Sequence, residues 1–308
     1  APGSGKKGRI ALIPHSRPTV GEWEIDAVVE CLRKGHLSYH EEIRALEDRL
    51  AETCGKGTEA IAVSSGTAAL YLALTALGVV RDDCVAIPSY TCNSLFAAVS
   101  FAGGRAIPVD ADEGGINISS ATITPFLRQG VKAAIVPHMF GYLADAGAIV
   151  DLDVSVVEDC AQAIGARFAD SACAGSKGHV GVFSFSATKL VPVGEGGACV
   201  TRDKRLADRI RELRDCDERN LDPKAFNFKM TSPSAVLARE KLSMLPEELA
   251  MRERIARQYD EAFETLSFRL RSSQPQAVCH RYLVQTGRNV ELVLQKSREA
   301  GILCRRPV

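Results

Sequence analysis

The sequence predicts an α/β protein in which a mostly parallel sheet is flanked by helices on both faces and a smaller α+β domain follows. Two observations lead to this class. Short apolar runs alternate with helical stretches of roughly ten residues through the first two thirds of the chain, which is typical of βαβ units. After about residue 202 the helical stretches become longer and more highly charged, which indicates a second architecture.

Helices in the first part are expected where apolar residues recur at helical spacing. The first covers residues 22–33, where Trp23 is expected to pack in the core and Gly35 closes the helix. Further helices are expected at residues 41–53, 67–77 and 93–101. The apolar runs between the helices are the expected strands, at residues 60–63, 84–87, 105–109, 133–136, 155–157, 181–185 and 198–201.

The second part begins with charged helical stretches at residues 204–214 and 234–265, the latter interrupted near Pro246. A strand at residues 282–286 and a helix at residues 290–300 would start the small domain. We therefore expect three segments, namely a flexible N-terminal tail (1–12), a large domain (13–245) and a partial small C-terminal domain (246–308).

The composition is that of an average soluble globular protein, with 46% apolar and 25% charged residues among 308. Lysine plus arginine and aspartate plus glutamate both number 38, so no net charge directs the chain to nucleic acid or a membrane surface. The uncharged stretch at 60–80 is broken at 64–67 and is too short on either side to span a bilayer. The ten cysteines include no C-x-x-C pair, which predicts reduced thiols and no zinc site. We expect a cytoplasmic protein without a bound metal.

Residues 64–70, SSGTAAL, are the first candidate functional segment. A predicted strand ends there and a helix begins, so backbone N–H groups at the helix N-terminus could bind a phosphate, and Gly66 would allow close approach. An ordinary strand-to-helix turn with a serine or threonine cap explains the same residues.

Two single residues extend this argument. Asp159 follows a buried strand at the carboxyl edge of the sheet, where a carboxylate can keep a ring nitrogen protonated; it could equally cap a helix. Lys189 follows the strand at 181–185, where desolvation would favour a neutral amine able to form a Schiff base; a surface lysine is the simpler alternative. In this order, a phosphate turn, a ring-nitrogen carboxylate and a Schiff-base lysine are the parts that hold pyridoxal phosphate.

Several further segments carry one recognisable pattern. They are RP at 17–18, GE at 21–22, SSGTAAL at 64–70, PSYT at 88–91, PHMFG at 137–141, VVEDCAQAIGA at 156–166, FSFSATK at 183–189, GEGG at 194–197 and FNFKM at 226–230. With them the chain resembles the DegT/DnrJ/EryC1/StrS family of sugar aminotransferases, pyridoxal phosphate-dependent enzymes of fold type I. The resemblance runs from about Ile13 to Arg305, and FSFSATK followed by GEGG is its most specific part. It implies that the large domain binds the cofactor.

The resemblance implies a role for each matching residue. Lys189 would form the internal aldimine with pyridoxal 5'-phosphate and then move a proton between substrate and cofactor. Asp159 would keep the pyridine nitrogen protonated, and Gln162 would hydrogen-bond the ring hydroxyl. The cofactor phosphate would be bound by Gly66, Thr67 and Ser184. Asn227 would reach the phosphate in the neighbouring subunit, which implies a homodimer with shared active sites.

The resemblance also implies the reaction. Glutamate would donate the amino group and a nucleotide-linked keto sugar would accept it, in two ping-pong half-reactions that serve polysaccharide or glycosylated-metabolite biosynthesis. Lys189 favours transamination, because the sugar dehydratases of the family carry histidine there. Two alternatives stay open. One is amination of a free cyclic ketone of inosose or aminoshikimate type, against which Gln162 argues mildly, and the other is a binding or regulatory protein that has lost catalysis.

Two features depart from the family pattern. Cys92 lies where many relatives have an aromatic ring that stacks on the cofactor, and Tyr90 is a candidate substitute. Relatives continue beyond the position of Arg305, so part of the small domain is expected to be missing from this sequence. Either the sequence has been cut short, or the protein is a reduced member of the family. Beside the motifs, Cys160 is expected to be buried, and His138 is expected either to face the substrate or to be a capped core residue.

Overall fold

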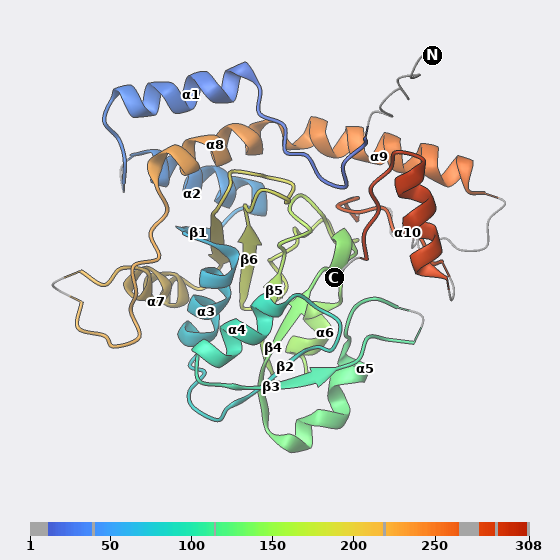
Figure 1. Cartoon of the computed structure of the whole chain (residues 1–308). Coiled ribbons are helices and arrows are strands. Elements are labelled where there is room, and N and C mark those ends of the chain that lie inside the picture. Colours follow the sequence, from blue (N-terminus) through green and yellow to red (C-terminus); the bar gives the residue numbers. More distant parts are fainter. Residues whose placement is uncertain are drawn as a thin grey trace, which may run out of the picture.

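The computed structural model describes residues 12–38, 41–113, 115–217, 220–264, 277–286 and 289–306. Within them, seven strands form one sheet in the order β1-β7-β6-β5-β4-β2-β3 (Figure 1). The strands are β1 (Glu59–Val63), β2 (Cys84–Pro88), β3 (Arg105–Val109), β4 (Val131–Pro137), β5 (Ser155–Asp159), β6 (Val180–Ser184) and β7 (Gly197–Thr201). Each lies within two residues of its predicted position. All of the predicted tail except Leu12 falls outside the described residues.

The prediction of a mostly parallel sheet is confirmed. The pairs β2–β3, β2–β4, β4–β5 and β5–β6 are parallel, whereas β7 pairs antiparallel with both β1 and β6. Residues 185–196 join β6 to β7 without a helix, and such a connection returns the chain in the opposite direction. This return brings the Lys189 loop back over the carboxyl end of β6, where Ser186 and Gly194 form a bridge.

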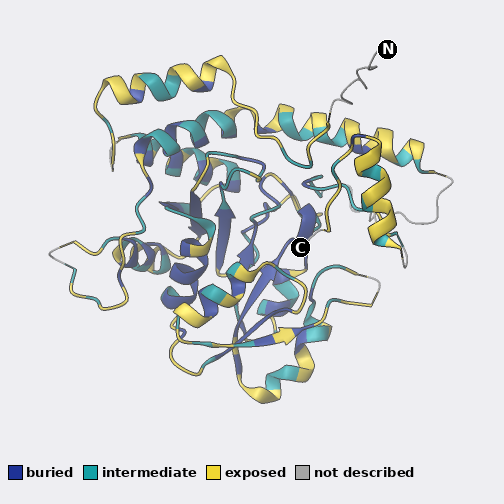
Figure 2. Ribbon diagram, in the orientation of Figure 1, coloured by how far each residue is buried: buried dark blue, intermediate teal, exposed yellow. Residues whose placement is uncertain are grey.

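Helices cover both faces of the sheet. One core cluster lies between the sheet and α3, α4 and α7; on the other face, α2 and α8 cover β1, β7 and β6, and α5 and α6 cover the β2, β4 and β5 end. Their bounds are α1 (Glu22–Arg33), α2 (Glu41–Cys54), α3 (Gly66–Ala76), α4 (Asn93–Phe101), α5 (Ser120–Ile123), η1 (Thr124–Gln129), η2 (Met139–Gly141), α6 (Ala146–Val150), α7 (Lys204–Arg214), α8 (Ser232–Ser243), α9 (Leu245–Ala262) and α10 (Val290–Glu299). Burial follows this layering: most strand residues are dark, the edge strand β3 is partly exposed, and the outer faces of α1 and α10 are exposed (Figure 2).

The predicted break near Pro246 is the junction between α8 and α9. Pro246 lies in the first turn of α9, where a missing N–H costs no intrahelical hydrogen bond. The domain boundary at residue 245 stays a prediction. None of the helices described is both long enough and apolar enough to cross a membrane.

The predicted strand at 282–286 is wrong. Only Val284 forms a bridge, and the rest of this stretch is irregular. The Tyr282 ring instead packs against Tyr259 and Phe263 of α9, and its hydroxyl donates to Asp260 Oδ1 at 2.9 Å. A strand needs a neighbour for its backbone groups, and here aromatic packing on a helix decides the conformation.

The predicted core position of Trp23 is also wrong, because 71% of the residue is exposed. Its indole Nε1–H donates to Glu240 Oε2 on α8 at 2.7 Å. The side of α1 that contacts α8 carries Cys31 and also Glu24, whose carboxylate pairs with Lys241 at 2.7 Å. A helix that packs on another helix, outside the main core, buries only a narrow stripe.

Candidate active site

The strands β5 and β6 present their last side chains to the α3 face of the sheet. Side chains alternate along a strand, so Asp159 shares this face with the core residue Val157, and Glu158 points to the opposite face. Asp159 is in register with Val182, and Ser184 lies two residues beyond Val182 on the same face. The carboxyl ends of the two neighbouring strands therefore place Asp159 and Ser184 together.

The start of α3 lies against Ser184. A Cβ at Gly66 would lie 2.8 Å from the Cβ of Ser184, so glycine is required where the helix approaches β6. The Oγ of Ser65 accepts from the N–H of Ala68 at 3.1 Å and caps the helix. The N–H groups of Gly66 and Thr67 have no acceptor within the helix. The segment is thus both a capped turn and a set of amides beside Ser184 that suits an anion.

Asp159 is a nearly buried carboxylate, with 8% of the residue exposed. Its Oδ1 accepts from the N–H of Ala161 at 3.0 Å, so it caps a turn and not an α-helix. Burial raises the pKa of Asp159, while this hydrogen bond and the charge of Lys189 lower it. A cationic group beside this carboxylate would stabilise its charged form, which burial destabilises by removing water.

Gln162 holds the turn at 139–141. Its Oε1 accepts from the N–H of Phe140 at 2.8 Å, and Phe140 has the left-handed backbone that non-glycine residues rarely adopt (φ 58°). The C-terminal segment rests on the same turn, because the N–H of Val278 donates to Gly141 O and that of His280 to Phe140 O, both at 3.2 Å. The oxygen of Gln162 is therefore committed to the protein, whereas its amide nitrogen can donate to a ligand.

Lys189 lies half-buried in the loop between β6 and β7, with its N–H donating to Ser186 O at 2.9 Å. Its side chain lines a cavity of about 420 Å³ together with residues 14–19 and the guanidinium groups of Arg252 and Arg281. No role for residues 14–19, Arg252 or Arg281 was expected from the sequence, where Arg252 is only one residue of the charged stretch at 234–265. These residues lie far from Lys189 in the sequence, and only the fold brings them beside it.

Asn227 does not join this cluster within the single chain. It is exposed, and its Oδ1 accepts from the N–H of Lys229 at 3.4 Å. The next residue, Phe228, accepts through its backbone oxygen from the N–H of Ser64 at 2.7 Å. The segment that carries Asn227 thus runs past the strand end that leads to Gly66, with the amide directed to solvent.

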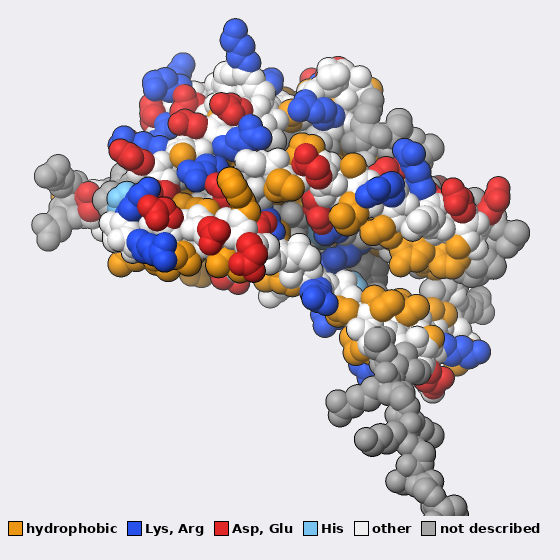
Figure 3. All heavy atoms as spheres, turned by 90° about the horizontal axis from the view of Figure 1, so that it is seen from above, with side chains coloured by type: hydrophobic (Ala, Val, Ile, Leu, Met, Phe, Trp, Pro, Cys, Tyr) orange, Lys and Arg blue, Asp and Glu red, His pale blue; other side chains and the backbone are white. Residues whose placement is uncertain are grey.

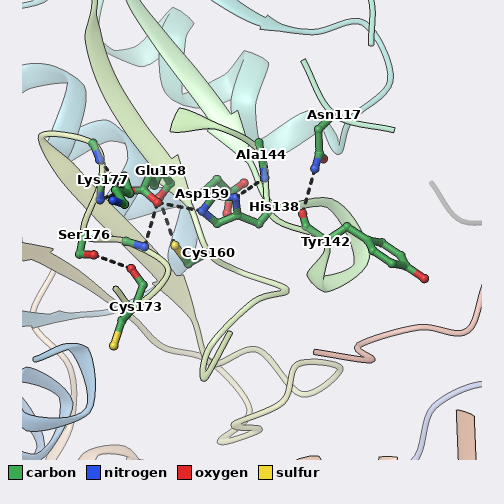
Figure 4. A network of polar contacts seen from close by, with 12 residues as sticks. Asn117, His138, Tyr142, Ala144, Glu158, Asp159, Cys160, Cys173, Ser176 and Lys177 are labelled. Atoms are coloured by element: carbon green, nitrogen blue, oxygen red, sulfur yellow. Dashed lines mark hydrogen bonds and ion pairs between the residues drawn. The ribbon is translucent and has the colours of Figure 1, made fainter. Parts of the chain in front are cut away.

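A buried network on the other face of β5 was not anticipated from the sequence (Figure 4). The fully buried Glu158 accepts from backbone N–H groups of Gly175 at 3.0 Å, Lys177 at 2.5 Å and Gly178, and from His138 Nε2–H at 2.9 Å. Burial acts to raise the pKa of Glu158, but the hydrogen bonds from His138 and from the loop amides outweigh it and hold the pKa below its ordinary value. One carboxylate therefore fixes the 175–178 loop under the strand that carries Asp159.

His138 belongs to this network as a core residue. Its Nδ1 accepts from the N–H of Ala144 at 3.0 Å, so Nε2 carries the hydrogen that Glu158 accepts. Cys160 is buried as expected, and burial raises the pKa of its thiol. Ligand atoms of His138, Glu158 and Cys160 lie within 4.8 Å of one another, but hydrogen bonds within the protein already occupy the ring and the carboxylate.

Comparisons with known proteins cover nearly the whole chain. The sequence model of the DegT/DnrJ/EryC1/StrS aminotransferase family matches residues 18–306. GDP-perosamine synthase of Caulobacter vibrioides (strain ATCC 19089 / CIP 103742 / CB 15) is 31% identical over 274 residues, which are 85% of this chain and 72% of that protein. The structure of S. venezuelae DesV has a TM-score of 0.84 at 30% identity, covering 91% of this chain and 78% of that chain. The aminotransferase TlmJ of Streptoalloteichus hindustanus has a TM-score of 0.86 at 27% identity, covering 95% and 84%.

Proposed function

The chain belongs to the DegT/DnrJ/EryC1/StrS aminotransferase family, and from that premise we propose that it transfers an amino group from glutamate to a nucleotide-linked keto sugar. It is an aminotransferase, and its cofactor is pyridoxal 5'-phosphate. The observation that supports a sugar acceptor most is the similarity to GDP-perosamine synthase, whose name specifies a GDP-linked compound. We also propose a cytoplasmic role in polysaccharide biosynthesis.

The residues at the α3 face fit this cofactor. Gly66 approaches Ser184 closely at the start of α3, and the backbone amides of this helix N-terminus suit a phosphate. The desolvated carboxylate of Asp159 suits a protonated ring nitrogen, since an opposite charge compensates for its burial. Helix N-terminal amides beside Ser184 and the carboxylate of Asp159 thus lie at neighbouring strand ends of one sheet face, which supports a phosphorylated, cationic ring as the occupant.

Each residue would then have a distinct task. Gly66, Thr67 and Ser184 would donate hydrogen bonds to the phosphate, and Asp159 would keep the ring nitrogen protonated. The amide nitrogen of Gln162 would donate to the ring hydroxyl, because its oxygen is held by Phe140. When bound, the cofactor supplies an aldehyde and an electron-withdrawing ring. Lys189 would carry the amine that anchors the cofactor and would move the proton at the reacting carbon of the substrate.

We further propose that two copies share their active sites. Asn227 is exposed and makes only a long hydrogen bond to the adjacent backbone, so its amide is available to a neighbouring molecule. Asn227 would bind the cofactor phosphate in the partner subunit. Sedimentation of the cofactor-loaded protein tests this assembly, and a monomer with full activity would refute it.

Gly66→Ala is expected to weaken cofactor binding at least about tenfold, the equivalent of one charge-assisted hydrogen bond. The added methyl group would meet Ser184 at 2.8 Å and displace the start of α3, and with it the amides of Gly66 and Thr67. Titration with pyridoxal phosphate gives the dissociation constant. Gly147→Ala is the matched control, since a Cβ there meets only Asp145 Oδ1 at 3.7 Å. Equal affinity of the two variants would show that the phosphate lies elsewhere.

The proposed reaction is tested one half at a time. We expect glutamate to remove the visible absorption band of the cofactor-loaded protein and to yield 2-oxoglutarate. A GDP-linked keto sugar should then restore the band, with the amino sugar detected by mass spectrometry. Restoration by a free cyclic ketone alone would favour the inosose or aminoshikimate type of acceptor. A band that responds to no amino acid would identify a binding protein, and the proposed reaction would be withdrawn.

A further inference from the structure

The cavity beside Lys189 carries a surplus of positive charge. Two segments, three helices and Arg281 surround it: the segments are residues 14–19 and 187–192, and the helices contribute Glu24 of α1, the end of α8 and the start of α9. Seen from above, lysine and arginine side chains lie in a hollow of the surface (Figure 3). The cationic side chains that line the cavity are Arg17, Lys189, Lys241, Arg252 and Arg281; His15 also lines it, but burial and the charges of Arg281 and Arg305 lower its pKa. The carboxylates that line it are Glu24, Glu247 and Glu248.

Ion pairs account for only part of this charge. Lys241 Nζ pairs with Glu24 at 2.7 Å, and Arg252 Nε pairs with Glu248 at 2.9 Å. Outside these two ion pairs, the lining residues carry one negative charge, on Glu247, and three positive charges, on Arg17, Lys189 and Arg281. Like charges gathered in a half-buried cavity are unfavourable unless an anion joins them.

Arg281 lines the cavity next to the Lys189 loop. It is half-buried, and its Nη2–H donates to the backbone oxygen of Thr188 at 3.4 Å. No carboxylate pairs with it in the part of the chain that the structure describes. Burial lowers the pKa of Arg281, and the charges of Arg252 and Arg305 lower it further. A guanidinium has five N–H donors, so most of those of Arg281 remain for a ligand next to Lys189.

The neighbouring residue holds Arg281 in place. His280 is buried, with 5% exposed, and its backbone N–H donates to Phe140 O at 3.2 Å. Its ring Nδ1 is buried without a hydrogen-bond partner among the described residues. Burial, followed by the charges of Arg281 and Lys189, places the pKa of His280 well below its ordinary value, so the ring adds no charge of its own. His280 is therefore fixed by the backbone of the 139–141 turn, and it precedes a guanidinium that still has most of its donors available.

We propose that Arg281 binds an oxyanion of the substrate beside Lys189, either a carboxylate of the amino donor or a phosphate of the nucleotide-linked acceptor. The inference rests on the proposed function and identifies the residue that sets substrate preference within it. A guanidinium binds either group through two parallel N–H bonds, which fixes orientation as well as affinity. The anion would also relieve the repulsion between Arg281 and Arg252.

Two assays on the cofactor-loaded protein distinguish the sources of the oxyanion. The first is the half-reaction with glutamate, whose concentration dependence gives a half-saturation value and a limiting rate. The second is calorimetric binding of GDP, the probe for the phosphate group. If Arg281 binds a carboxylate, Arg281→Leu should raise the half-saturation value for glutamate at least about tenfold and leave the affinity for GDP unchanged. If Arg281 binds a phosphate, Arg281→Leu should lower the affinity for GDP at least about tenfold and leave the half-saturation value for glutamate unchanged.

Arg254→Leu is the matched control, because Arg254 is an exposed arginine of α9 and does not line the cavity. Arg281→Gln replaces Arg281→Leu if the latter does not fold, since it keeps a polar side chain and removes the charge. Glutamate and GDP responses equal to those of Arg254→Leu would overturn the proposal. If the wild-type protein ignores glutamate, the proposed reaction fails, and binding of 2-oxoglutarate and GDP by wild type and Arg281→Leu still decides the role of Arg281.

Discussion

Lys189→Ala is expected to lower the rate of both half-reactions by at least about 10³-fold while the protein keeps its fold. Lys189 is half-buried, lines the cavity and lowers the pKa of Asp159 through its charge, so its loss would remove both the proposed anchor for the cofactor and the proposed proton carrier. Single-turnover absorption with glutamate measures the rate. The cofactor band of the unreacted variant should also shift.

Two companions make this result specific. Lys189→Arg places a guanidinium at this position, whose pKa is too high for it to release a proton. It should therefore be as inactive as Lys189→Ala. Lys132→Ala should keep the wild-type rate, because that exposed amine only bonds Gly78 O at 2.6 Å and Asp83 Oδ2 at 2.8 Å. More than about a hundredth of the wild-type rate in either Lys189 variant would assign the proton transfer to another group.

Glu158→Ala is expected to lower the free energy of unfolding by about 3–5 kcal/mol. The substitution leaves the amides of Gly175, Lys177 and Gly178 and the Nε2–H of His138 buried without their common acceptor. Urea unfolding at neutral pH measures the loss. Asp170→Ala should cost much less stability than Glu158→Ala, because the ion pair of Asp170 with Lys177 is exposed to solvent, where water screens it. Similar losses in both variants would mean that the network does not stabilise the fold.

The pH dependence of the same two proteins gives a second readout. The native pKa of Glu158 lies below the ordinary value of 4.5, so its contribution to stability is present above pH 4.5 and is lost as the pH falls through the native pKa. The difference in unfolding free energy between wild type and Glu158→Ala should therefore be constant near neutrality and shrink below about pH 4.5. A difference that does not change with acid would assign the stabilisation to packing instead of charge.

Prediction from sequence succeeded where structure depends on near neighbours in the chain. The helix at 93–101 and the charged helix at 204–214 have the predicted bounds, because apolar spacing within ten residues decides which face is buried. The position of Asp159 at the carboxyl end of its strand follows from the short apolar run that precedes it. The face of the sheet to which its side chain points follows from period-two alternation. The same rule could have separated Glu158 from Asp159 and suggested that the buried carboxylate would need several donors.

Prediction failed where the partner of a segment decides its conformation. The stretch at 282–286 has the composition of a strand, yet Tyr282 packs on α9. Trp23 lies on an apolar stripe, yet α1 packs on α8 outside the main core. Spacing describes which side of an element is apolar, but it does not say whether a neighbour covers that side.

By itself, the sequence determined the α/β class, the seven strands of the sheet and the candidate residues Gly66, Asp159, Ser184 and Lys189, because each depends on local periodicity or on a contiguous motif. Only the tertiary structure decided that Gly66 touches Ser184 and that Arg281 lies beside the Lys189 loop. Such contacts join residues far apart in the chain, and they form only when helix and sheet packing sets the distance between them.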